Sequence, residues 1–137
     1  MINIIKENFK RAIFALIFSI ITIGTLSFLS FETPYGLFLV GSFGSSMVLL
    51  FGYPESPFAQ PKNVFFGHFI TSLIGVLTLE FLPLDQFLQI AIAVGIGIFL
   101  MIILGVTHPP AGGNPIIIVL ASASYSFLLN PIIIGSV

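Results

Sequence analysis

The chain has 137 residues, of which 57% are hydrophobic and only 7% are charged. Soluble domains usually carry about a quarter of charged residues, so the composition excludes a water-soluble globule and indicates one all-α, polytopic membrane domain over residues 1–137. A net charge of −1 leaves no basic patch for nucleic acid, and the absence of cysteine excludes disulfides and thiolate metal sites.

The first predicted element is a membrane span over residues 12–30, which follows the basic residues Lys6, Lys10 and Arg11. Its apolar run of about 20 residues is long enough to cross the hydrocarbon core, whereas the apolar region of a signal peptide has about 7–15. We therefore predict a first helix that stays in the membrane.

Further apolar stretches follow along the chain. They are separated by segments rich in proline, glycine and polar residues, which interrupt a continuous helix. The predicted stretches cover residues 35–52, 63–82, 87–106, 116–123 and 132–137. The bundle is therefore expected to combine long spans with short, broken helices.

The few charged residues predict an orientation. If the N-terminus is cytoplasmic and each long stretch crosses once, Lys62 joins the N-terminal basic cluster on the cytoplasmic side, and Glu32, Glu80 and Asp85 lie opposite. We expect a multi-pass protein of the cell inner membrane. A re-entrant second stretch is the alternative, and it would move Lys62 to the other side.

Two pairs of segments suggest an internal duplication at an offset of about seventy residues. The paired segments are residues 44–50 with 113–119, and 58–61 with 128–131. The halves would be residues 12–82 and 87–137, and three crossings per half make the second copy inverted. This repeat requires the last helix to continue beyond Val137. Chance similarity is the alternative, because glycine and proline are common in membrane helices.

Small and polar residues break the membrane stretches at residues 41–46 and 112–114, and these two breaks carry groups able to hold a small anion. Short helices that start near Met47 and Ile116 would present free N–H groups and a positive dipole end at membrane depth. Close packing of helices through small residues is the alternative reading. The candidate substrate-binding residues are Ser45, Ser46, Lys62, His68, His108, Gly112, Gly113 and Asn114.

Two histidines are the sharper candidates. His108 precedes two prolines and can bind an anion, shuttle a proton or cap the carbonyls of the fourth span. His68 lies inside the third span, where an ionisable residue favours a function, although a neutral ring bonded to a carbonyl is the alternative. No carboxylate accompanies either histidine and no catalytic constellation appears, so we expect no metal, no cofactor and no enzyme.

Three motifs in order resemble the HPP family of integral membrane proteins. They are the Thr-His-Pro-Pro-Ala-Gly run at residues 107–112, the small-residue break at 44–51 and the Ser-Pro-Phe-Ala-Gln-Pro loop within 56–64. Plastid and cyanobacterial relatives are regarded as nitrite transporters, and some bacterial members carry cytosolic CBS domains. The resemblance implies a transporter or channel for nitrite or a similar small monovalent anion.

Five or six short spans are few for a lone transporter, so a homo-oligomer in the lipid bilayer is expected. The alternatives are a structural or regulatory membrane subunit whose motifs serve packing only, and a transporter of another small solute.

Overall fold

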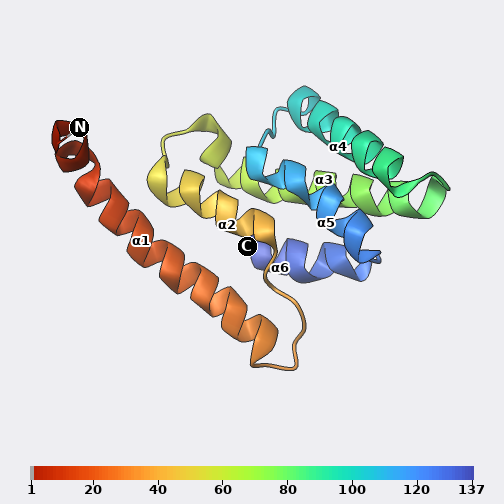
Figure 1. The fold of residues 1–137 in the computed structure, drawn as a ribbon, viewed down its shortest axis with the longest axis horizontal. Coiled ribbons are helices and arrows are strands. Elements are labelled where there is room, and N and C mark those ends of the chain that lie inside the picture. The colour runs from red at the N-terminus through yellow and green to blue at the C-terminus, as the bar shows by residue number, and fades with distance from the viewer. Residues whose placement is uncertain (1) are drawn as a thin grey trace.

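The computed structural model describes residues 2–137, with side chains from residue 4 onward. These residues form helices and connecting segments without a strand, which confirms the predicted all-α class. Figure 1 shows the arrangement. In chain order the elements are α1 (Ile2–Phe31), α2 (Gly41–Met47), η1 (Val48–Gly52), η2 (Pro57–Ala59), α3 (Pro61–Phe81), α4 (Gln86–Ile103), η3 (Pro109–Gly113), α5 (Asn114–Ala121), η4 (Leu128–Ile133) and α6 (Ile134–Ser136).

Three of the described helices, α1, α3 and α4, are long and apolar enough to cross a membrane. With 30 residues, α1 is about 45 Å long at the usual helical rise, which exceeds a hydrocarbon core of about 30 Å. Its first turns, which carry Lys6, Lys10 and Arg11, can therefore extend beyond the apolar layer. The predicted span at residues 12–30 lies within a helix that begins earlier.

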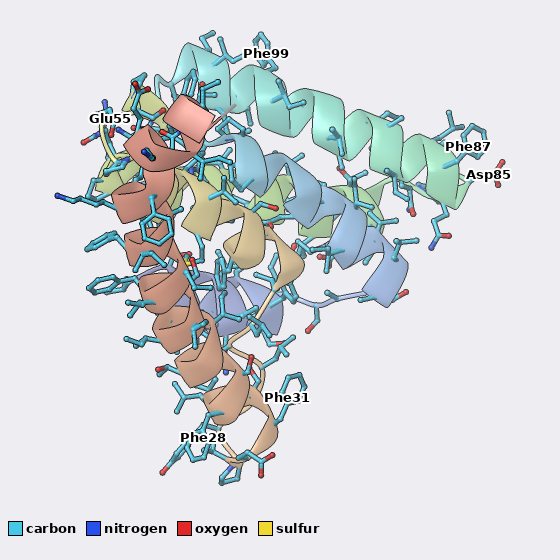
Figure 2. All side chains as sticks on the ribbon, turned by 60° about the vertical axis from the view of Figure 1, so that its left-hand side comes forward. Phe28, Phe31, Glu55, Asp85, Phe87 and Phe99 are labelled. Atoms are coloured by element: carbon cyan, nitrogen blue, oxygen red, sulfur yellow. The ribbon has the colours of Figure 1, made fainter. Side chains whose placement is uncertain are left out.

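Helix α1 lies apart from the other long helices and meets the molecule through α2 and η1 (Figure 1). Large apolar side chains cover its surface, and Phe28 and Phe31 project from its far end in Figure 2. In water such a surface would be costly, whereas lipid tails meet it without penalty. The position of α1 is thus consistent with a bilayer on its outer faces.

Helix α3 is the centre of the fold and packs against α4, α5 and η3. Glycines make these approaches possible. A methyl group at Gly75 would lie 3.0 Å from the Cα of Pro115, and one at Gly97 would lie 3.2 Å from Cγ2 of Thr71. Close backbone contact through small residues is the usual way in which helices associate in lipid.

The first predicted break is wrong in detail. The small residues at 41–46 lie inside α2, which begins at Gly41 instead of near Met47 and continues into the wider helical turn of η1. The N–H groups of Ser45 and Ser46 therefore lie within a helix and are not presented at its start. A helix satisfies its own backbone groups, which is the state that lipid favours.

The second predicted break also differs from the expectation. Helix α5 begins at Asn114 instead of near Ile116, and the turn η3 precedes it without a gap. The backbone N–H of Asn114 donates to the carbonyl of Ala111, and Pro109 and Pro110 carry no N–H. The two helices thus begin before the positions at which free amides were expected.

Contacts at the start of α1 locate the segment between η1 and α3, which leads to Lys62. The side chain of Arg11 pairs with Glu55 at 3.3 Å and lies 5.6 Å from the ring centre of Tyr53. Figure 2 shows Glu55 at the end of α1 opposite Phe28. The second predicted stretch, residues 35–52, therefore ends near the start of α1. A stretch that crosses the membrane once would end there, whereas a re-entrant stretch would return to the other end of α1.

The element order agrees with the one that the predicted repeat requires. In Figure 1, α2 and α5 run in opposite directions, as do α3 and the segment from η4 to α6. Gln60 and Asn130 are both extended residues, each just before a proline, Pro61 or Pro131, in a helical segment. The duplication itself stays a prediction.

Candidate functional site

A reversal of the chain after α4 brings the second histidine to the centre of the fold. Gly105 adopts a positive φ of 65°, and its N–H donates to the carbonyl of Ile102 while that of Val106 donates to Met101. This is the glycine-terminated helix end in which a left-handed residue closes the last turn. The chain then runs back along α3. His108 therefore lies beside α3 and does not cap the carbonyls at the end of α4.

Glycine on α3 lets His108 approach that helix closely. A methyl group at Gly67 would lie 2.8 Å from the Cβ of His108 and 3.3 Å from the carbonyl oxygen of Val106. His68 is the next residue on α3, and the ring centres of the two histidines are 5.0 Å apart. Forty residues separate the two histidines in sequence, yet they form one pair in space.

A serine hydroxyl joins the two histidine rings. Ser46 Oγ lies 3.1 Å from Nε2 of His68 and 2.8 Å from Nε2 of His108. The same oxygen lies 3.0 Å from the carbonyl oxygen of Ser42, one turn earlier in α2. Ser46 therefore connects the α2 helix to α3 and to the segment before η3.

The outer nitrogens of both rings also have partners. Nδ1 of His108 lies 2.8 Å from the carbonyl oxygen of Phe58 in η2, and Nδ1 of His68 lies 3.0 Å from Nδ2 of Asn114 at the start of α5. That amide nitrogen also donates to Ser72 Oγ at 2.9 Å. We call Ser46, His68, His108 and Asn114 the histidine cluster.

The histidine cluster is buried and carries no fixed charge. His68, His108 and Asn114 are fully buried, and Ser46 is 1% exposed. Among the side chains of residues 4–137, none of the buried ones is a lysine, arginine, aspartate or glutamate. The positive charge that these buried side chains can offer to a negative solute is therefore a proton on a histidine.

The other predicted site residues lie outside the histidine cluster. Ser45 and Lys62 are exposed, and Gly112 and Gly113 are half-buried with open space where a side chain would begin. No other part of the chain therefore approaches the backbone of these glycines closely. Ser45 and Ser46 point about 100° apart on α2, and of the two Ser46 faces the histidines, so a binding role of Ser45 stays a prediction.

Lys62 lines a pocket at the edge of the cluster. The pocket has a volume of about 330 Å³, and no acidic side chain is among its lining residues. Its wall includes Phe58, whose carbonyl holds His108, and Thr107, the residue before His108. The full lining is Pro57, Phe58, Gln60, Lys62, Asn63, Gly105 and Thr107. The pocket thus approaches the cluster from the Lys62 end of α3.

Comparison with known proteins places the chain in a family. The family model described as "HPP, transmembrane region" matches residues 5–137. The chain belongs to the HPP family. The predicted resemblance is thereby confirmed, and the His-Pro-Pro triplet that suggested it supplies one ring of the histidine cluster.

Two curated relatives come from Dictyostelium discoideum and are named as transmembrane proteins. One is 34% identical over 105 residues, which cover 72% of this chain and 37% of the relative. The other is 33% identical over 107 residues, which cover 73% and 34%. This HPP chain therefore spans about a third of the length of the relatives it matches. No solved structure matches it.

Residues that the sequence analysis did not single out complete the site. Ser72 follows His68 by one helical turn, so their shared face of α3 was a usable signal. Phe43 packs its ring edge-on against His68 with 5.0 Å between ring centres. The carbonyls of Ser42 and Phe58 carried no signal, because a backbone acceptor is present at every residue.

Proposed function

We propose that this HPP chain is the membrane part of a transporter for a small monovalent anion, with nitrite as the first substrate to test. The observation that carries the proposal is a buried pair of histidines at the junction of α2, α3 and α5. A functional role is the default for ionisable side chains in a membrane interior. No chemical conversion of the solute is proposed.

The two short helices do not begin where the amides were expected to hold the anion, so the proposal rests on the histidines instead. An anion at membrane depth needs a nearby positive charge, because desolvation of a lone charge is very costly. With no buried lysine or arginine among residues 4–137, a protonated histidine is the available counter-charge. Anion and proton would therefore cross together, as a pair without net charge.

The route to the cluster would begin at the pocket that contains Lys62. A lysine at the pocket mouth attracts anions from solution, and the pocket wall shares Phe58 and Thr107 with the surroundings of His108. We further propose that the transport unit is a homo-oligomer of inner-membrane chains with cytoplasmic N-termini. Three long spans are few to enclose a path alone.

The second candidate is a membrane subunit in which the histidine cluster only fastens helices together. The observation that favours it is the hydrogen bonding itself, because each histidine ring nitrogen has a partner in the structure. Polar networks whose members are hydrogen-bonded in this way can specify a unique core without any transport role.

Reconstitution into liposomes separates these candidates. Nitrite uptake by the wild-type chain should rise when the outside is made acidic, and it should be lost in His108→Gln, which keeps a polar side chain but cannot take a proton. Ser45→Ala is the matched control, because Ser45 is exposed on the same helix as Ser46. Circular dichroism and gel filtration would show that each variant is folded.

Uptake by His108→Gln equal to that of the wild type would refute the assignment of the site. An absence of nitrite uptake by folded wild-type protein would favour the structural subunit, unless nitrate, formate or chloride is transported in its place. Uptake that ignores the pH gradient would contradict the coupled proton.

A further inference from the structure

The carbonyl of Phe58 fixes the hydrogen positions on His108. A carbonyl oxygen can only accept, so the contact of 2.8 Å places an N–H on Nδ1 of His108. In the neutral ring, Nε2 is then bare and must accept a hydrogen bond. The hydroxyl of Ser46, 2.8 Å away, is its donor.

The same reasoning gives His68 the opposite tautomer. Because the Ser46 hydroxyl donates to His108, its oxygen accepts from His68, which places an N–H on Nε2 of His68. Nδ1 of His68 is then bare and accepts from the amide nitrogen of Asn114. The two hydrogens of that nitrogen serve His68 Nδ1 and Ser72 Oγ, the two nearest acceptors. The carbonyl oxygen of His68 lies 3.3 Å from the same nitrogen, and an amide oxygen in that place would be repelled, so we assign the nitrogen to this side of the amide.

The Ser46 hydroxyl has a second acceptor that this neutral arrangement does not use. The carbonyl oxygen of Ser42 lies 3.0 Å from Ser46 Oγ. If the hydroxyl hydrogen turns toward that carbonyl, the oxygen becomes free to accept from Nε2 of both histidines. His108 can then carry N–H groups on both nitrogens, and each has an acceptor without movement of any heavy atom.

We propose that the histidine cluster is a binding site for one proton, held on Nε2 of His108 and gated by rotation of the Ser46 hydroxyl. The proton adds to the bare nitrogen of His108, and no bond between heavy atoms forms or breaks. This inference rests on the proposed function, for which it names the residue that carries the coupled proton. Ser46 and Asn114 are positioning residues in this scheme.

Asn114 directs the proton to His108 and away from His68. A proton added to Nδ1 of His68 would place an N–H against the amide nitrogen of Asn114, where two donors would face each other. His108 meets no such conflict, because Ser46 Oγ can accept. The ring centres are 5.0 Å apart, so a second proton on His68 would also be repelled by the first.

Few other ionisable groups face the cluster. The sequences of α2, η1, η2, α4, η3 and α5 contain no titratable side chain. The titratable side chains of α3 are Lys62, His68 and Glu80. Lys62 is exposed at the pocket mouth, and Glu80 lines a different pocket with Tyr125. The N-terminal turns of α1 carry Lys6, Glu7, Lys10 and Arg11, and all of these are exposed. The proton is therefore held by His108 and not by a carboxylate.

NMR of histidine labelled at both ring nitrogens tests the inference on the full chain in lipid bilayers. The chain has two histidines, so His68→Gln leaves the signals of His108 alone. At neutral pH we expect N–H on Nε2 of His68 and on Nδ1 of His108. On acidification, His108 should gain its second N–H while His68 keeps a bare Nδ1.

Two variants test the positioning residues. Ser46→Ala removes the acceptor for the new N–H, so the doubly protonated form of His108 should fall about tenfold at a fixed acidic pH, the change typical of losing one hydrogen bond to a charged group. Asn114→Asp supplies an acceptor at Nδ1 of His68, so the N–H of that ring should move to Nδ1. Ser45→Ala should match the wild type in both measurements.

Identical tautomers on the two rings would overturn the inference. So would protonation of His68 before His108, or no protonation of either ring at the lowest pH at which the chain stays folded. The tautomers are measured without any substrate. If they follow the expectation while liposomes take up no anion, the proposed transport fails and the proton site stands.

Discussion

Replacing Gly67 by alanine tests the close packing on which the histidine cluster depends. The new methyl group would lie 2.8 Å from Cβ of His108, which is closer than such contacts allow, and 3.3 Å from the carbonyl oxygen of Val106, which is a tight contact. Overpacking of this kind costs about 1–3 kcal/mol. Alanine also favours a helix over glycine by about 1 kcal/mol, so the net loss of stability is smaller than the strain.

Gly95→Ala is the matched control for that strain. Gly95 is an exposed residue inside α4, and no heavy atom lies within 4 Å of its added methyl group. Both variants gain the same helix propensity, so the difference between their unfolding free energies isolates the clash at about 1–3 kcal/mol. Denaturation of both variants in mixed micelles, followed by circular dichroism, measures that difference. Equal stability of the two would refute the close approach of His108 to α3.

Three further predictions concern the ends of the bundle. Gln89→Ala should destabilise the α3–α4 turn by about 0.5–1.5 kcal/mol in thermal unfolding, because its buried side chain donates to the carbonyl of Leu82 at 2.8 Å. Glu55→Gln should change the unfolding free energy by less than about 1 kcal/mol, since its pair with α1 is exposed. The chain has no native cysteine, so Asn8→Cys and Asp85→Cys can be labelled in intact vesicles, and a membrane-impermeant reagent should reach them from opposite sides.

The long helices could be predicted because their evidence is local. The expected spans at residues 63–82 and 87–106 match α3 (Pro61–Phe81) and α4 (Gln86–Ile103) with shifts of a few residues at their ends. Long apolar runs between prolines leave the backbone few alternatives in lipid. The gap between the two predicted spans likewise overlaps the short connection between these two helices.

The broken helices could not be placed from sequence, because their start depends on tertiary contacts. Glycine and serine lower helix propensity, which suggested a gap at residues 41–46. In the fold, Ser42, Phe43 and Ser46 are buried on one face of α2 against the rest of the molecule. Burial and the demand for backbone hydrogen bonds in lipid outweigh a propensity difference of about 1 kcal/mol per glycine.

The members of the histidine cluster, Ser46, His68, His108 and Asn114, were all candidates from the sequence, and a proton shuttle was one of the roles predicted for His108. What the sequence could not show is that side chains and not helix starts come together here, because the anion was expected at free backbone N–H groups. A backbone N–H at membrane depth is costly to leave unpaired, so helices tend to use it before a solute can. Side chains are under no such demand from secondary structure, and a hydroxyl hydrogen can turn between acceptors at little cost. A site that must gain and lose a charge inside a bilayer is therefore better built from a serine and two histidines than from the ends of helices.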